Sequence, residues 1–160
     1  MIKKYFLLNA LFVLSVTSYA EPLDPVKLLS SYVGIDTVNP PGNESRAVDF
    51  YAKIFEEEGI EFSSGESAPG RGNIWARIKG GDLPALILLQ HTDVVPATKK
   101  YWDTDPFVAE IKDGYLYGRG VIDMKGAGIS QLVSFIRLHR SGLSLNRDVV
   151  FVATADEEAG

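Results

Sequence analysis

The sequence has 160 residues, a formal net charge of −5 at pH 7 and no cysteine. Without cysteine the chain forms neither a disulfide framework nor a thiolate metal site, so a bound metal would need His, Asp and Glu as ligands. The acidic balance also argues against nucleic acid or an anionic membrane as a partner.

The first 20 residues predict a signal peptide. Lys3 and Lys4 form a positive start, an apolar run of about a dozen residues follows, and residues 18–20 read Ser-Tyr-Ala, a small-x-small cleavage motif. The apolar run is short of the ~20 residues that a membrane-spanning helix needs. We therefore expect cleavage after Ala20, a secreted or periplasmic product, and no membrane association after cleavage.

Two helices are predicted after this leader. The first begins at Pro25, directly after a capping Asp24. Residues 39–42 read Asn-Pro-Pro-Gly and cannot continue a helix, and a second helix is expected from about residue 44 to residue 58, ended by Gly59. A short extended piece and a Gly/Ser-rich loop over residues 63–72 follow.

The periodicity then becomes strand-like. From Asn73 apolar and polar residues alternate, which predicts a half-buried strand ending at Gly80. Residues 85–89 and 149–153 are apolar throughout, which is typical of strands covered on both faces of a sheet. Between them, residues 110–117 predict a hairpin that turns at Asp113-Gly114.

An amphipathic helix separates the two apolar runs. Its apolar positions are Ile129, Leu132, Val133, Ile136 and Leu138. Strand, crossover helix and strand make a βαβ unit, so we predict an α/β fold with a mixed, partly parallel sheet sandwiched by helices. Ligands of such sheets bind beyond the carboxyl ends of the strands, which is where candidate site residues are expected.

Polar residues that can hold a metal follow both apolar runs. His91 and Asp93 come after the first; residues two apart in an extended segment point the same way, so one can bind metal while the other accepts the remaining ring N–H. Residues 156–158 (Asp-Glu-Glu) come after the second, and adjacent carboxylates repel unless a cation or proton is present. The alternatives are an ordinary hydrogen-bonded histidine and a solvated acidic loop.

The third candidate segment lies at the start of the crossover helix. Residues 118–126 read Gly-Arg-Gly-Val-Ile-Asp-Met-Lys-Gly, and Asp123 within them can cap the helix or bridge two metal ions with its two oxygens. The glycine spacing does not fit a dinucleotide-binding loop. Because three separate segments bring zinc-compatible ligands to one sheet edge, we favour a metal site over the separate alternatives.

Taken together, these segments resemble the zinc-dependent exopeptidase and deacylase family, which includes acetylornithine deacetylase, succinyl-diaminopimelate desuccinylase, aminoacylase and bacterial glutamate carboxypeptidase. The resemblance rests on residues 91–96 (His-Thr-Asp-Val-Val-Pro), 118–126 and 156–160 (Asp-Glu-Glu-Ala-Gly). It implies that His91 binds one zinc, Glu158 binds the other and Asp123 bridges both. It further implies that Glu157 is the general base and that Asp93 orients His91.

The resemblance also implies an activity and a larger protein. It implies two Zn²⁺ ions, or Co²⁺ or Mn²⁺ in their place, and hydrolysis of an amide bond in a small peptide or N-acyl amino acid, of the carboxypeptidase or aminoacylase type. Family members carry further ligands downstream and a lid or dimerisation domain, and His139 is better interpreted as a surface residue than as a ligand. We therefore expect residues 21–160 to be the N-terminal part of a zinc-dependent catalytic domain, truncated before the lid domain and inactive alone, with a homodimer only in a full-length form.

Two other interpretations stay open. The chain can be a truncated non-catalytic remnant or a secreted binding module that keeps the fold. It can also be an acidic calcium-binding loop protein, which is disfavoured because His91 is a poor calcium ligand. Hydrolysis assays with and without zinc distinguish these interpretations from the enzyme.

Overall fold

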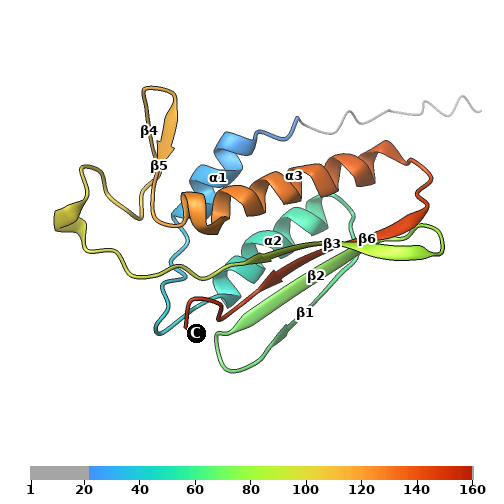
Figure 1. Cartoon of the computed structure of the whole chain (residues 1–160), viewed down its shortest axis with the longest axis horizontal. Coiled ribbons are helices and arrows are strands. Elements are labelled where there is room, and N and C mark those ends of the chain that lie inside the picture. The colour runs from blue at the N-terminus through green and yellow to red at the C-terminus, as the bar shows by residue number, and fades with distance from the viewer. Residues whose placement is uncertain (1–21, 160) are drawn as a thin grey trace, which may run out of the picture.

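The computed structural model describes residues 22–159, which form a mixed sheet with helices packed on it (Figure 1). The predicted signal peptide lies outside these residues. Among the helices of the described residues, none combines the length and apolar character needed to cross a membrane.

Three α-helices occur where the sequence predicted them: α1 (Pro25–Val33), α2 (Ser45–Glu57) and α3 (Gly126–Ser141). The side chain of Asp24 accepts hydrogen bonds from the backbone N–H groups of Val26 and Lys27 at 3.0 and 3.1 Å, so α1 has the predicted cap. Helix α2 ends just before Gly59, whose φ of +64° lies in the left-handed region that favours glycine. The predicted cap and stop are therefore confirmed.

Four strands form the main sheet in the order β1-β2-β6-β3: β1 (Phe62–Glu66), β2 (Gly72–Ile78), β3 (Leu83–His91) and β6 (Arg147–Thr154). Strand β2 pairs antiparallel with both β1 and β6, whereas β3 and β6 pair parallel. Helix α3 makes the crossover between the two parallel strands (Figure 1). The predicted α/β class, the βαβ unit and the mixed sheet are confirmed.

A long excursion separates β3 from α3. It contains the short helix η1 (Lys99–Tyr101), the hairpin of β4 (Glu110–Lys112) and β5 (Tyr115–Tyr117), and the turn η2 (Val121–Lys125) that leads into α3. Asp113 and Gly114 both have positive φ, +52° and +81°, as a tight type I′ hairpin turn requires. The predicted hairpin is confirmed, and Figure 1 shows it projecting from the body beside α1.

The loop predicted over residues 63–72 is partly a strand. Residues 63–66 belong to β1, whose register with β2 runs from Phe62 opposite Ala76 to Glu66 opposite Gly72. Serine and glycine are poor strand formers, so local propensity favoured a loop here. The strand forms because β2 offers a pairing edge, which is a property of the assembled sheet.

The core lies between one face of the sheet and the helices α2 and α3. Phe151 of β6 is fully buried at its centre, with ring centroids 5.3 Å from Tyr51, 5.5 Å from Phe55 and 5.8 Å from Phe135. The rings meet at tilted or edge-to-face angles, the arrangement that aromatic quadrupoles favour. This cluster fixes β6 under the helices, and the carboxyl end of β6 carries part of the candidate site.

Strand β3 lies at an edge of the sheet, and its burial differs from the prediction. Ile87 and Leu89 are 58% and 57% exposed. They pair with Val150 and Val152, so they share the sheet face opposite to that of Phe151. The prediction that residues 85–89 and 149–153 are covered on both faces is wrong for the described residues, because α2 and α3 lie against one face only.

We expect Phe151→Ala to lower the free energy of unfolding by about 3 to 5 kcal/mol, since it removes a ring from a packed core and leaves a cavity. The matched control is Ile87→Ala in the neighbouring strand, for which we expect a loss below about 1 kcal/mol because that side chain is already exposed. Urea unfolding followed by circular dichroism measures both values. Similar losses for the two variants would contradict the one-sided core.

Candidate metal centre

The register of the parallel strands brings two of the predicted segments together. His91 is the register partner of Thr154, and the backbone N–H of Thr92 donates to the carbonyl oxygen of Thr154 at 2.9 Å. The acidic residues 156–158 begin two positions after Thr154, so they lie beside His91 at the carboxyl edge of the sheet.

The two ring nitrogens of His91 have different surroundings. Nδ1 lies 3.1 Å from the backbone carbonyl oxygen of Asp93 and 3.4 Å from its Oδ1, whereas Nε2 lies 3.0 Å from Oδ1 of Asp123 and 3.9 Å from Oε2 of Glu157. A carbonyl oxygen only accepts, so Nδ1 is the donor and carries a proton. Nε2 is therefore the ring nitrogen that faces the carboxylates and can bind a metal.

Asp93 does more than orient the histidine ring. It is 1% exposed, and its carboxylate accepts from the backbone N–H groups of Glu157 and Glu158 at 3.2 and 2.8 Å and from Nδ2 of Asn39 at 2.8 Å. Burial raises the pKa of Asp93, but the hydrogen bonds from Asn39, Glu158 and Glu157 outweigh it and lower the pKa below its usual value. Asp93 is therefore an anion that holds the acidic turn in place.

Asp123 approaches from the turn that precedes α3. Gly120 adopts φ +81°, and a Cβ there would meet Cγ1 of Val94 at 2.5 Å, so a larger residue would shift the turn. The carboxylate of Asp123 is 74% exposed and faces His91. Helix α3 has no side-chain cap bond, so the helix-capping alternative for Asp123 is not realised in the structure.

Lys125 connects the turn that carries Asp123 to the end of α1. It is 1% exposed, and its Nζ donates to the carbonyl oxygens of Tyr32 at 3.0 Å and Ile35 at 2.8 Å, at the end of α1. Burial lowers the pKa of Lys125 to about 8, against a smaller opposing effect of Asp36. The ammonium thus ties the Asp123 turn to α1.

The ligand atoms of His91, Glu157 and Glu158 all lie within 4.8 Å of one another, close enough to hold one metal ion. Burial raises the pKa of Glu158, and the negative charges of Asp123 and Glu157 raise it further. A cation between these groups would remove this repulsion. An imidazole and carboxylates without any thiolate suit zinc as well as Co²⁺ or Mn²⁺, so the donor set fits the predicted metals.

The five predicted site residues therefore lie at one edge of the sheet, whereas His139 lies in the last turn of α3, at the opposite end of that helix from Asp123. Sequence reasoning missed Asn39, which was interpreted only as part of a helix-breaking turn. Its amide contacts Asp93, which lies 54 residues away in the sequence, and no local sequence pattern predicts such a contact.

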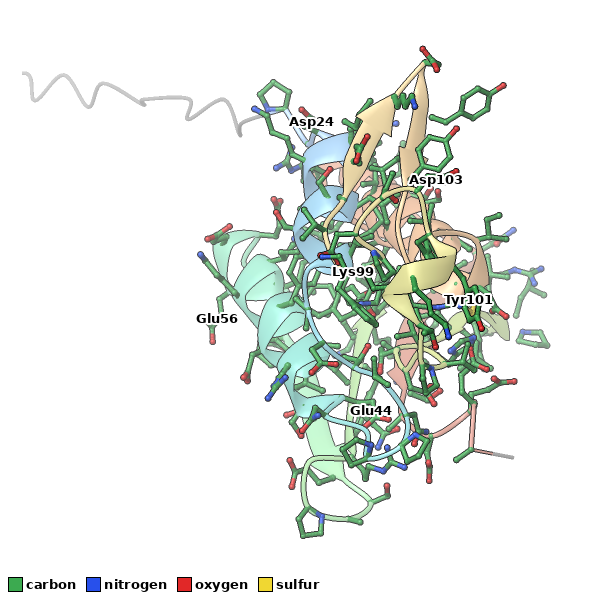
Figure 2. The ribbon with its side chains drawn as sticks, turned by 90° about the vertical axis from the view of Figure 1, so that its left-hand side faces the viewer. Asp24, Glu44, Glu56, Lys99, Tyr101 and Asp103 are labelled. Carbon is green, nitrogen blue, oxygen red and sulfur yellow. The ribbon has the colours of Figure 1, made fainter. Side chains whose placement is uncertain are left out.

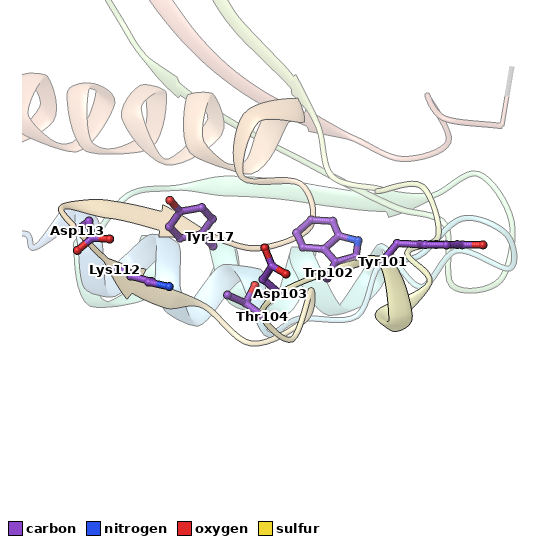
Figure 3. A pocket seen from close by; sticks show the side chains of 7 residues that line it. All are labelled: Tyr101, Trp102, Asp103, Thr104, Lys112, Asp113 and Tyr117. Carbon is purple, nitrogen blue, oxygen red and sulfur yellow. The ribbon is translucent and has the colours of Figure 1, made fainter.

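A separate hollow of about 350 Å³ lies between η1 and the β4–β5 hairpin (Figure 3). Figure 3 shows Trp102, Asp103 and Tyr117 along it, with Tyr101 at one end and Lys112 and Asp113 at the other. The guanidinium of Arg119 lies 5.3 Å from the ring centroid of Trp102. None of the predicted metal ligands lines this hollow, so it is distinct from the metal centre.

Residues 87–160 match peptidase family M20/M25/M40. This part of the chain is similar to the members of that family. The predicted family resemblance is confirmed, and the matched range contains all five predicted site residues, from His91 to Glu158.

Relatives in this family extend the match over most of the chain. Succinyl-diaminopimelate desuccinylase from Parvibaculum lavamentivorans is 36% identical over 89% of this chain and 36% of its own length. Human aminoacylase-1 is 35% identical over 84% of this chain and 34% of its own length. The chain thus spans about a third of the length of the curated relatives it matches.

Solved structures show the same fold. The M20 family metallo-carboxypeptidase Sso-CP2 from Sulfolobus solfataricus superposes with a TM-score of 0.73 at 22% identity, over 86% of this chain and 32% of that chain. Human carnosine dipeptidase 1 superposes with a TM-score of 0.61 at 29% identity, over 85% of this chain and 32% of that chain. The described residues therefore have the fold of part of an M20 catalytic domain.

We expect the affinity of the chain for Zn²⁺ to fall as the pH is lowered, because a protonated imidazole cannot bind a metal. Burial lowers the pKa of His91, but Asp123, Asp93 and Glu157 outweigh it and raise the pKa above its usual 6.5. Proton competition therefore begins at a higher pH than for an ordinary histidine. Zinc titrations between about pH 5.5 and 8 measure this dependence.

The control for this titration is His139→Ala, because His139 is the other histidine of the sequence and lies at the far end of α3. Its pH profile should overlay that of the unsubstituted chain. A zinc affinity that does not vary with pH in this range, or a profile that follows His139, would count against His91 as a ligand.

Proposed function

We propose that this chain supplies part of the active site of a metal-dependent hydrolase that cleaves an amide bond in a small peptide or N-acyl amino acid. The observation that carries the proposal is the convergence of His91, Asp123 and Glu157 from three separate segments, with Nε2 of His91 facing both carboxylates. The similarity to a desuccinylase and an aminoacylase supports an acyl or peptidyl amide as the substrate class.

The proposal includes two zinc ions, of which His91 would hold one and Glu158 the other, while Asp123 would be a ligand of both. When bound, zinc lowers the pKa of a coordinated water to about 7 and polarises the scissile carbonyl group. Because Nδ1 of His91 donates to the carbonyl oxygen of Asp93, Nε2 is the ring nitrogen that could bind a metal in place of its contact with Asp123. Oδ1 of Asp123, at 3.0 Å from Nε2, lies on the side from which a shared ion would contact both residues.

Glu157 is the proposed general base. Its side chain is 62% exposed, and its Oε2 lies 3.9 Å from Nε2 of His91, so it reaches the site without being enclosed by it. Such a carboxylate can take a proton from the attacking water and return it to the leaving amine. Asp93 holds the backbone of Glu157 and thereby the direction of its side chain.

Substitution of the two glutamates separates their roles. We expect Glu158→Ala to remove tight zinc binding, because it deletes a ligand, and Glu157→Ala, in a complete version of the protein, to keep zinc while turnover is lost. Zinc titration of the chain, and hydrolysis of dipeptides and N-acyl amino acids by the zinc-loaded protein, measure the two effects.

An equal loss of zinc in both variants would make Glu157 a ligand. If a complete, folded and zinc-loaded form of the protein shows no hydrolysis, the non-catalytic remnant or binding module becomes the better description. The assay therefore decides between the two classes of function that the sequence left open.

We further propose that the protein is secreted or periplasmic. The support is the leader pattern of residues 1–20, with its positive start, apolar run and Ala20 cleavage motif. We expect the exported protein to begin at Glu21, as N-terminal sequencing would show. A product that starts at Met1 and stays in the cell would disprove the export signal.

A further inference from the structure

A partly buried charge network lies behind the acidic turn of the metal centre. We call it the Arg71 cluster; its members are Asn39, Glu44, Arg71 and Asp156. They come from the turn before α2, the start of α2, the start of β2 and the turn after β6. The sequence assigned no site role to Asn39, Glu44 or Arg71, and Asp156 was considered only as part of the acidic segment 156–158.

Arg71 is the centre of the cluster. Its Nη1 donates to Oε1 of Glu44 at 2.7 Å, and its Nη2 donates to Oδ1 of Asn39 at 3.1 Å and to Oδ1 of Asp156. The side chain is 15% exposed and that of Glu44 is fully buried. The planar fork of a guanidinium allows one residue to contact all three partners at once.

Glu44 fixes the position of Arg71. Figure 2 shows Glu44 among other side chains near the start of α2, whereas Glu56 of the same helix points away from the body. Oε2 of Glu44 accepts from the backbone N–H of Asn43 at 3.1 Å. A Cβ on Gly42 would lie 1.4 Å from Nη1 of Arg71, so the glycine leaves the space that the guanidinium occupies.

Asp156 is the point where the cluster meets the metal centre. It has a φ of +71°, in the left-handed region that residues other than glycine adopt only at a cost in free energy. Its carboxylate accepts from Arg71 and, at 3.1 Å, from Nδ2 of Asn39. These contacts offset the cost of a backbone turn that directs the next two residues toward His91.

Asn39 contacts both Asp156 and Asp93, the two residues through which the acidic turn is held. Its Nδ2 donates to Asp156 and also to Oδ2 of Asp93 at 2.8 Å, while Asp93 accepts from the N–H groups of Glu157 and Glu158. The acidic turn is therefore held at its start by the Arg71 cluster and further along by Asp93.

We propose that Arg71, fixed by Glu44, is a positioning residue that, by holding Asp156, presets Glu158 for metal binding and Glu157 beside it for its role as base. The inference rests on the proposed metal centre and adds residues outside it. Partners that orient ligands without touching the metal contribute to affinity because they reduce the rearrangement that binding requires.

Two substitutions test this role in the 160-residue chain. Arg71→Lys keeps a positive charge beside buried Glu44 but cannot bridge all three partners, and Asp156→Asn changes a side chain that is 48% exposed. We expect each to weaken Zn²⁺ affinity by about 10-fold to 100-fold, the range typical of residues that orient ligands. The double variant should be no weaker than the weaker single variant, because both substitutions break one contact.

The matched control is Arg77→Lys. Arg77 lies in β2, which begins directly after Arg71; it pairs with Asp148 and is 58% exposed. We expect its zinc affinity to equal that of the unsubstituted chain. Thermal unfolding without metal is measured for every variant, so that a general loss of stability is separated from a loss of preset geometry.

The outcomes distinguish the inference from the metal centre itself. Unchanged zinc affinity in Arg71→Lys, or additive losses in the double variant, would overturn the role of Arg71 while leaving the metal centre intact. If the unsubstituted chain binds no zinc, the metal centre is overturned and the positioning role with it. The positioning role would also be overturned if Arg77→Lys lost zinc affinity together with thermal stability, because the loss would then come from general destabilisation.

Discussion

The parallel ladder between β3 and β6 is the constraint on which the candidate site depends. Its register sets Gln90 beside Ala153 and His91 beside Thr154, so both chains leave the sheet at the same edge. A shift by one residue would turn His91 to the other face of the sheet. The ladder is in turn fixed by Phe151, whose burial among Tyr51, Phe55 and Phe135 sets which face of β6 lies under the helices.

The cost of this arrangement is a concentration of negative charge. Asp123, Glu157 and Glu158 approach one imidazole, and the raised pKa of Glu158 reflects both burial and its neighbours. The chain offsets part of this repulsion with backbone N–H groups and with Asn39 around Asp93, and with Arg71 at Asp156. The remaining charge faces Nε2 of His91, where a metal ion would neutralise it.

Local sequence patterns predicted a helix start or a turn correctly where neighbouring residues alone stabilise it. Asp24 and Pro25 start α1 through bonds to residues two and three positions away, and the turn at Asp113-Gly114 needs only its own backbone conformation. The apolar runs correctly indicated strands, but their burial depended on what covers them. Ile87 and Leu89 are exposed because the helices lie on the other face of the sheet. The sequence could not show which face is covered, because every residue of the run is apolar and no polar residue marks the uncovered face.

The sequence by itself determined the α/β class, the order of the elements and the residues with metal-binding chemistry, since strand ends, caps and ligand types are properties of short segments. Only the tertiary structure decided that residues 63–66 form a strand, that Asp93 holds the acidic turn, and that Asn39, Glu44 and Arg71 stand behind it. Asn39 meets Asp156 across 117 residues and Arg71 meets it across 85. Contacts of that separation arise from the packing of whole elements, so no window of the sequence contains them.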